Sequence, residues 1–582
     1  RKFIYTLVLL SSITFGNAQT PFETSPPANP NAIRILHSDF IDKNQNEIPG
    51  AIIFTGNVQV EHNGVKINCN KAYHYTDEDY VKAFGNVSLN QGDTIVMNSR
   101  YAEYNGKTQF AFATGNVNLR SPDSNLTTDT IYFDRSIQQA YYKSWGTITN
   151  KENTLKSKSG RYFLNSKKYV FKTAVTVVNP QVTIKTNNLD FYDNSGHAYV
   201  YGPSTITSKE NVINTTKGFY DTKNDVGKLL DKSNIVYNNR KVEGDIINYD
   251  RKKNFAKATN NVKITDTINN MIATGHYAEV FRNVGGTKKD SMFITKKALI
   301  KTLVEKDTMY LHGKKILVTG PIEDRTIRAF NNVRFFKTDM SGKCDSIHSI
   351  HSNNKTQLTK LIGKPVIWNN DNQMTGDEIH LVRNNKTEKL DSLKILNNAF
   401  LIQKDTIDED NYNQVKGQFL YGKFRENKLY EVDLIKNTEK IYFMYNDANE
   451  MVGIDKGVSS SINMQLEDNK IIELTSFKKI ESDTYPDKDF PKNARRLRGF
   501  VWRIDEKITS LENIFPDEEK AIDEKIKAET KKKDKEEKKP MDVLKETTDY
   551  GKKEAKKEPS KKAKVKRQKK QVKKQKRKSS FM

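Results

Sequence analysis

Few residues in this 582-residue chain are spaced for metal or acid–base chemistry. Cys344, His348 and His351 form the group that most resembles a metal site, since thiolate and imidazole are ligands that zinc prefers. On a strand, however, positions 344 and 348 share one face and position 351 points to the other. We predict no metal site here, because coordination would require a bend or a loop.

The acidic residues also predict no catalytic centre. They stand mostly beside expected turns, as at Asp134, Asp193 and Asp250, where a carboxylate can bond to nearby backbone. No hydrolase elbow, phosphate-binding loop, dinucleotide fingerprint or metalloprotease helix occurs. We therefore expect a chain that is not an enzyme and has no cofactor.

One short segment mixes arginines with aromatic residues. It contains Arg495, Arg496, Arg498, Phe500, Trp502 and Arg503. Bidentate arginine contacts suit a phosphorylated sugar. The interpretation we favour is an end cap in which Phe500 and Trp502 cover the last repeat.

The elements that must position these residues belong to a repeat. Gly56-Asn57-Val58, Gly85-Asn86-Val87 and Gly115-Asn116-Val117 recur at steps of 29 and 30 residues. Weaker copies follow at Ile148, Val175, Ile206, Ile235, Val262, Ile300, Val333, Val366, Phe400 and Ile441. About a dozen units therefore cover residues 50–480.

Within a unit, apolar residues alternate with polar ones, which predicts strands with one apolar face. A second alternating run leads to a turn, as at Asn105-Gly106, a strong hairpin signal. Each unit is thus predicted to be two antiparallel strands and two turns. The apolar rows of unit after unit either meet in a filled core or stay apart as a trough, and the sequence leaves both possible.

The ends of the chain differ from the repeats. Residues 1–18 resemble a signal peptide that is cleaved between Ala18 and Gln19; the alternative is a membrane anchor, but the apolar run is shorter than the roughly 20 residues a span needs. Residues 516–582 hold 26 Lys/Arg and 14 Asp/Glu, which predicts a disordered or helical basic tail. Between them we expect a linker at 19–32, repeats at 33–180 and 181–480, and a capping segment at 481–515. Cys69 and Cys344 are expected to be free thiols.

The phrases GNVSLNQGDTIVMNSRYAEYNGKTQFAFA and DTIYFD, at residues 85–113 and 129–134, resemble the OstA-like family, which includes the LptA-type periplasmic lipopolysaccharide-transport proteins. The resemblance is strongest over 33–178. It implies an elongated antiparallel β-jellyroll whose apolar interior holds acyl chains and whose sheet edges stack against partner proteins. The implied interior residues are Val58, Val60, Val87, Leu89, Val117, Leu119, Ile131 and Phe133. This chain departs from the family in its number of repeats and in its basic tail.

These observations predict a non-catalytic periplasmic protein that carries lipopolysaccharide toward the outer membrane and can associate with that membrane. Expected partners are lipopolysaccharide, other transport proteins of both membranes and, through the basic tail, an anionic membrane surface or cell wall. Nucleic acid is not expected. The alternatives are a structural or adhesive β-solenoid of the cell envelope and, last, a glycan-processing enzyme.

Overall fold

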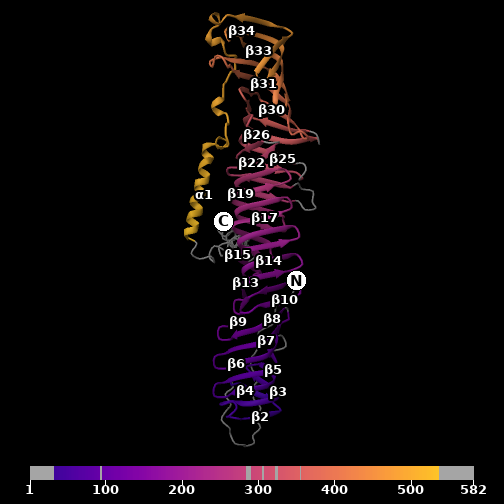
Figure 1. Ribbon diagram of the computed structural model, residues 1–582, viewed down its shortest axis with the longest axis vertical. Coiled ribbons are helices and arrows are strands. Elements are labelled where there is room, and N and C mark those ends of the chain that lie inside the picture. The colour runs from indigo at the N-terminus through magenta and orange to yellow at the C-terminus, as the bar shows by residue number, and fades with distance from the viewer. Residues whose placement is uncertain are drawn as a thin grey trace, which may run out of the picture. The chain divides into compact units, whose positions relative to one another are not determined.

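The structure is a computed structural model that describes residues 32–91, 95–122, 124–282, 290–304, 307–321, 325–353, 356–468 and 470–536 (Figure 1). The predicted signal peptide, nearly all of the 19–32 linker and the tail from residue 537 lie outside the described residues. Within them, every strand pairing is antiparallel, and residues 517–536 form the one α-helix. The predicted fold class, an all-β antiparallel repeat array, is confirmed, and the helix at 517–536 is the described part of the tail predicted to be disordered or helical. No helix among these residues is long and apolar enough to cross a membrane.

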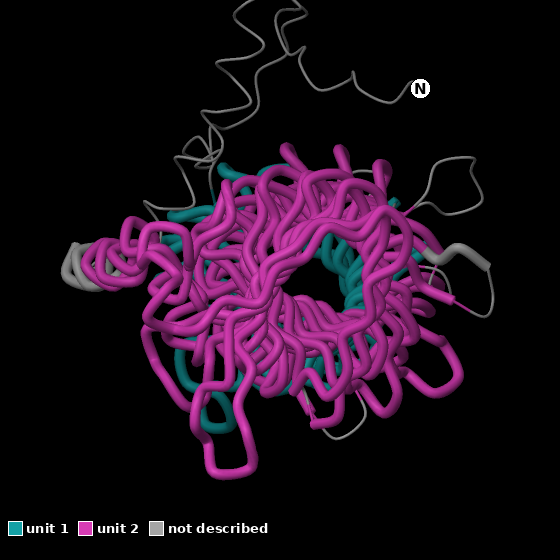
Figure 2. The backbone as a smooth tube through the Cα atoms, turned by 90° about the horizontal axis from the view of Figure 1, so that it is seen from above, with its two compact units in different colours: residues 1–166 teal, residues 167–582 magenta. Residues whose placement is uncertain are grey.

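The chain forms two compact units, residues 1–166 and 167–582, which Figure 2 shows in separate colours. In unit 1, successive strands pair as neighbours from β3 to β8, and β1 and β2 both pair with β3. The strands are β1 (Arg34–His37), β2 (Phe40–Asp42), β3 (Ile52–His62), β4 (Val65–Tyr75), β5 (Tyr80–Gln91), β6 (Ile95–Asn105), β7 (Phe110–Arg120), β8 (Asn125–Asp134), β9 (Gln139–Tyr142), β10 (Gly146–Thr149), β11 (Thr154–Ser157) and β12 (Ser159–Phe163).

Unit 2 is itself a ladder of hairpins, and its strands follow one another in chain order in Figure 1. Its first strands are β13 (Lys168–Val178), β14 (Val182–Tyr192), β15 (His197–Ser208), β16 (Asn211–Asp221), β17 (Val226–Tyr237), β18 (Arg240–Asp250), β19 (Phe255–Asp266), β20 (Met271–Phe281), β21 (Ser291–Thr295), β22 (Leu299–Val304), β23 (Asp307–His312) and β24 (Lys315–Thr319). The later ones are β25 (Thr326–Lys337), β26 (Met340–Asn353), β27 (Thr356–Ile362), β28 (Val366–Asn369), β29 (Asn372–Thr375), β30 (Glu378–Asn384), β31 (Leu390–Lys404), β32 (Tyr412–Arg425), β33 (Lys428–Tyr445), β34 (Met451–Glu467), β35 (Lys470–Phe477) and β36 (Glu481–Tyr485).

A kink recurs where the repeat has its Gly-Asn pair. Two consecutive residues take positive φ, for example Gly56 at 81° and Asn57 at 44°, and glycine and asparagine tolerate that conformation best. The register with the next strand shifts at the same point, as a β-bulge does. The pairs are 56–57, 85–86, 115–116, 173–174, 231–232, 260–261, 296–297, 331–332, 363–364, 397–398, 436–437 and 478–479. The repeated Gly-Asn is therefore a bend inside a strand and divides it into two halves.

The Asn-Gly hairpin rule holds at one site and fails at another. Asn63 and Gly64 join β3 to β4 with φ of 49° and 81°, as a two-residue type I′ turn requires. At Asn105-Gly106, in contrast, residues 106–109 form a longer turn in which Gln109 takes the positive φ of 59°. Asn105 Oδ1 accepts the Thr108 N–H at 2.8 Å, so the asparagine side chain stabilises that turn.

After β36 the chain runs back along the outside of unit 2 as a strap, which we define as residues 486–536 and which Figure 1 shows in yellow. It contains the short 3₁₀ turns η1 (Asp487–Asp489), η2 (Lys492–Ala494), η3 (Ile504–Glu506) and η4 (Leu511–Asn513), followed by α1 (Asp517–Glu536). Buried Phe490, Leu497, Ile508 and Ile514 anchor it. Its ion pairs include Lys343 Nζ to Glu506 at 2.5 Å and His276 Nε2 to Asp523 at 2.8 Å. Because His276 lies on β20 and Lys343 on β26, the strap contacts earlier repeats as well as the last one.

Candidate functional site

The interior of unit 1 is lined by two kinds of half-strand. Before each kink the inward residues are mostly small, as at Ala83 and Ala113. After each kink they are larger and apolar, as at Val87 and Val117. One buried cluster joins both sets: Ile33, Phe54, Val58, Val60, Ile67, Cys69, Ala72, Val81, Ala83, Val87, Met97, Ala102, Ala113, Val117 and Ile131. Unit 1 therefore has one continuous apolar interior.

The eight residues implied by the family resemblance lie on this interior in graded positions. Val58, Val60, Val87, Val117 and Ile131 belong to the buried cluster, and Leu89 and Leu119 pack against it while half-buried. Phe133 is half-buried too and pairs with Ala111 on β7 and Ala140 on β9. The structure thus brings seven of the eight residues together in or against the buried cluster. The eighth, Phe133, lies further along β8. Whether they contact lipid remains a prediction.

A column of small residues opposite the kinks was not singled out from the sequence. Its members in unit 1 are Cys69, Ser99, Thr128 and Ser157, which pair with Val58, Val87, Val117 and Gly146. In unit 2, Thr186 and Thr215 continue it one repeat apart. The spacing of 29 residues from Ser99 through Thr128, Ser157 and Thr186 to Thr215 was a usable signal.

The hydroxyl groups of Thr128, Ser157, Thr186 and Thr215 bond to backbone carbonyls near the kinks. The buried Ser99 Oγ is the exception and has no hydrogen-bond partner among the described residues. Thr128 Oγ1 donates to Trp145 O at 2.8 Å, and Ser157 Oγ lies 2.7 Å from Tyr142 Oη. Burial raises the pKa of the Cys69 thiol in the same column to about 11. A thiol with such a pKa is unreactive at neutral pH. Both cysteines are buried and free.

The inward row of unit 1 also carries His62, His74 and Tyr104. His62 Nδ1 lies 2.8 Å from Tyr104 Oη, and both side chains are on the inward row. Burial lowers the pKa of His74, which favours its uncharged form, and raises the pKa of Tyr104. The inward row of unit 1 thus combines mainly apolar side chains with the His62–Tyr104 contact.

The turn carboxylates bond to backbone, and Cys344 and His348, two of the three residues that most resemble a metal site in the sequence, do not share one face. Asp134 and Asp250 accept backbone N–H groups of their own turns, from Ser136 and Lys253, as predicted. Cys344 packs in the apolar core, while His348 lies on the outer row opposite Arg328. The shared face predicted for Cys344 and His348 is therefore wrong, because the bulge between them reverses the alternation. Across the described residues, no three His, Cys, Asp or Glu side chains are grouped to hold a metal.

The arginine and aromatic segment is occupied by the strap's own contacts. Arg495 pairs with Asp487 at 2.7 Å, and Arg503 pairs with Glu506 at 2.8 Å. Arg496 lies 4.5 Å from the Tyr412 ring centroid. Phe500 and Trp502 also pack against Tyr412, on β32. These contacts favour a structural role over the binding of a phosphorylated sugar.

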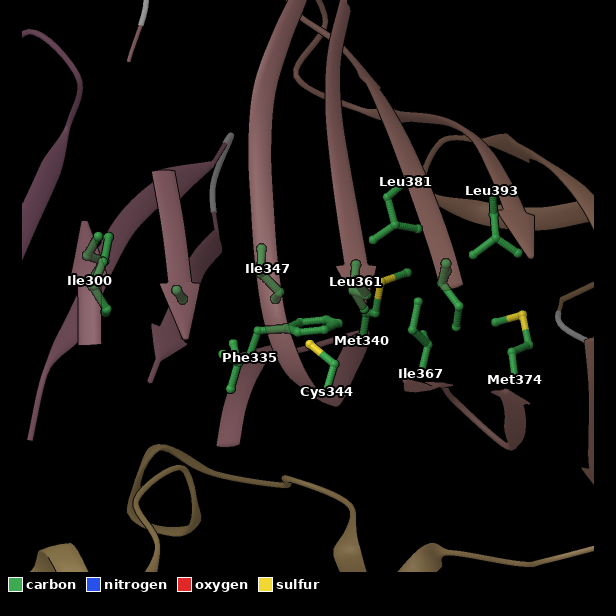
Figure 3. Close-up of a cluster of buried hydrophobic side chains, with 14 of the residues drawn as sticks. Ile300, Phe335, Met340, Cys344, Ile347, Leu361, Ile367, Met374, Leu381 and Leu393 are labelled. Carbon is green, nitrogen blue, oxygen red and sulfur yellow. The ribbon is translucent and has the colours of Figure 1, made fainter. Parts of the chain in front are cut away.

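The interior of unit 2 differs in its filling. Figure 3 shows Ile300, Phe335, Cys344, Leu361, Ile367 and Leu393 pointing into one cluster from neighbouring strands. Ile300, Leu361, Ile367 and Leu393 are at most 1% exposed. Large side chains therefore close this part of unit 2, from β22 to β31. Leu89, Leu119 and Phe133 of unit 1 keep accessible surface, as do Ile206 and Ile235 in the first strands of unit 2.

The first strands of the chain are similar to a known protein family. Residues 31–187 match the model of the family described as OstA-like protein. The predicted resemblance is confirmed over these residues, so the chain is an all-β repeat protein with an OstA-like segment that spans the apolar interior of unit 1. Comparison with curated proteins finds no match.

Among solved structures, the chain is similar to LptH from Pseudomonas aeruginosa, the LptA-homologous periplasmic component of the conserved lipopolysaccharide transport device. The identity is 15%, the TM-score is 0.18, and the match covers 18% of this chain and 81% of LptH.

Proposed function

We propose that unit 1 binds the acyl chains of lipopolysaccharide in its apolar interior and serves the transport of this lipid toward the outer membrane. The observation that carries the proposal is the graded inward row, which is buried at Val87 and Val117 but accessible at Leu89 and Leu119. An accessible apolar row gains free energy when an acyl chain covers it, at about 25 cal/mol per Å² of apolar surface removed from water. The OstA-like match over residues 31–187 covers these strands and supports the proposal.

The proposal includes a setting and a binding mode. The protein acts in the periplasm, without catalysis, and hands lipid to partner transport proteins through an exposed sheet end. In unit 1 that end is formed by β1 and β2, where Leu36, Phe40 and Ile41 are 49%, 73% and 68% exposed. Unpaired strand edges and apolar side chains together favour pairing with another chain.

Site-specific photocrosslinking tests lipid binding. A benzophenone amino acid at Leu89 or Leu119 is expected to capture purified lipopolysaccharide. The same group at Ser88 or Asn118, which pair with Asn98 on the outer polar row, is expected to capture none. Equal capture from both rows would refute a one-sided interior.

The second candidate is a structural β-solenoid with a filled interior, and the closed core of unit 2 favours it for that unit. Crosslinkers at Ile300 and Leu393 distinguish the two functions within one chain. Lipid capture at Leu119 but not at Leu393 supports transport by unit 1. Absence of capture at both, with the fold intact, would favour the structural role.

A further inference from the structure

The most unusual exposed side chain of unit 1 is Trp145, between β9 and β10. It takes a positive φ of 47° and is 47% exposed. Its backbone N–H donates to Lys158 O at 2.8 Å. The equivalent kink position holds asparagine at 57, 86, 116, 261, 332, 398 and 437, lysine at 232, 297, 364 and 479, and alanine at 174. Trp145 is thus the aromatic exception in this column.

Among the described contacts of Trp145, Lys156 Nζ lies over the indole ring, and the others are made by the backbone N–H and carbonyl. Tyr142 and Ser157 bond to each other inside the strand break, and the Tyr142 ring fills the space beside Gly146. The backbone around residue 145 is therefore fixed from within, while the indole is turned outward. A bulky side chain in left-handed backbone is unfavourable, and a strained, exposed residue without a packing role points to recognition.

The surroundings of Trp145 are strongly basic. Residues 139–163 contain Lys143, Lys151, Lys156, Lys158 and Arg161 against one acidic residue, Glu152. Lys156 Nζ lies 5.3 Å from the Trp145 ring centroid. Lys143 lies 5.0 Å from the ring of Tyr132, and Arg161 lies 4.7 Å from that of Tyr141. The basic side chains named here are exposed.

We infer that Trp145, with Lys143, Lys156, Lys158 and Arg161, forms a docking surface for a membrane that carries anionic lipids. An indole has an apolar body and one polar N–H, so it is stable at the level of lipid headgroups. Lysine and arginine stems extend along apolar surface while their charges reach the headgroups. Cations already lie over the Tyr132, Tyr141 and Trp145 rings, which leaves less open ring face for stacking on sugars. This surface is on the outside of unit 1 and does not depend on lipid binding in the interior.

Tryptophan fluorescence tests the inference in the full chain. The chain has three tryptophans; Trp368 is 1% exposed and Trp502 is half-buried. Vesicles of phosphatidylglycerol and phosphatidylcholine in equal parts are expected to shift the emission to the blue, whereas vesicles of phosphatidylcholine alone are not. Trp145→Asn installs the residue that most other kinks use, so its melting temperature should not fall, and the blue shift should disappear. A shift of the same size in Trp145→Asn would overturn the inference.

Charge removal gives a matched control for adsorption through other basic parts of the chain. The triple variant Lys143→Gln, Lys156→Gln, Lys158→Gln is expected to weaken vesicle binding by roughly fivefold for each charge removed at low salt. The triple variant Lys209→Gln, Lys232→Gln, Lys263→Gln removes the same charge from exposed positions of unit 2. Equal loss in both triple variants would show general electrostatic attraction and would refute a specific surface at Trp145.

Discussion

The interiors of the two units are built on the same kinked hairpin but are filled differently. Among the described residues, the largest side chains that are fully buried all belong to unit 2: Trp368, Phe443, Leu229, Ile247, Ile264, Ile294, Ile300, Ile316, Leu361, Ile367, Met374 and Ile379. Both units have alanines on the half-strands before their kinks, Ala83 and Ala113 in unit 1 and Ala258 and Ala329 in unit 2. After the kinks, Leu89 and Leu119 of unit 1 are half-buried, whereas the equivalent Ile264 and Phe335 of unit 2 are buried. The kinked backbone therefore does not determine whether an interior is closed.

This difference separates stability from binding. Each isoleucine or leucine buried completely in unit 2 contributes about 1.5–3 kcal/mol by leaving water. The half-buried leucines of unit 1 gain less in the free protein and retain surface for a ligand. We therefore regard unit 2 as the more stable interior and unit 1 as the candidate binding interior.

The largest expected effect is truncation of a core leucine. Leu393→Ala removes a side chain that is 0% exposed and should lower the free energy of unfolding by about 2–5 kcal/mol. Leu119→Ala, at a half-buried position of unit 1, should cost about 1 kcal/mol or less. Hydrogen exchange followed by mass spectrometry during denaturation measures the two units separately. Equal losses would show that the two interiors are filled alike.

Enlarging an inward alanine in each unit is a second test of how tightly the two interiors are packed. Ala399→Leu adds volume at a position of unit 2 that is 0% exposed and should cost about 1–3 kcal/mol through overpacking. Ala111→Leu adds the same volume at a half-buried inward position of unit 1 and should change stability by less. If lipid occupies that interior, Ala111→Leu should also reduce photocrosslinking from Leu119. Unchanged capture would place the lipid elsewhere.

The strap gives a third, smaller effect that is specific to unit 2. Gln373 is 0% exposed; its Nε2 donates to Val501 O at 2.8 Å, and its Oε1 accepts the Arg503 N–H at 2.7 Å. Gln373→Ala leaves both strap groups without this partner and should cost about 1–3 kcal/mol. Hydrogen exchange at residues 501–503 should accelerate. Gln418→Ala, whose amide bonds to Asn397 away from the strap, should leave that exchange unchanged.

The period and the apolar alternation made much of the repeat predictable. Val87 and Leu89, or Val117 and Leu119, stand two residues apart on the inward row because a strand alternates its faces. Simple alternation predicts the inward face correctly only as far as the next kink. On the strand opposite a kink the inward positions change phase, as from Cys344 to Ile347, and simple alternation therefore misplaced His348.

Two other features, the Asn105-Gly106 turn and the path of the strap, could not be predicted without the tertiary structure. Asn63-Gly64 and Asn105-Gly106 are the same dipeptide, yet only the first forms the two-residue turn. The second packs beside Asp79 of the preceding turn and donates its Gly106 N–H to Asp79 O at 2.7 Å. The strap lacks a period altogether. Its position depends on contacts between residues far apart in sequence, such as Gln414 Oε1 with the Leu497 N–H at 2.9 Å, which no local pattern predicts.

The smallest effect concerns the pH dependence of the strap's attachment. Glu506 accepts hydrogen bonds from Arg503 Nε at 2.8 Å and Lys343 Nζ at 2.5 Å. The Arg503 contact first, and then the Lys343 contact, lower the pKa of Glu506 from 4.5 to about 2. Because the attached strap holds the carboxylate ionised, its contribution is complete above about pH 4.5. It is lost as the pH falls from 4.5 toward 2.

Pepsin, which is active in this pH range, can measure the loss. The rate of cleavage within residues 497–508 should rise as the pH falls from 4.5 toward 2. This rise should be steeper than the rise caused by protonation of the other carboxylates of the protein. Glu506→Gln removes the titrating group, so it should be cleaved faster than the wild type at pH 4.5 and depend less on pH below it. Glu512→Gln, at an exposed position of the same strap, should follow the wild type. If Glu506→Gln keeps the wild-type pH dependence, the ion pairs with Lys343 and Arg503 do not control the strap, and its attachment to unit 2 depends on the apolar contacts of Leu497, Ile508 and Ile514 instead.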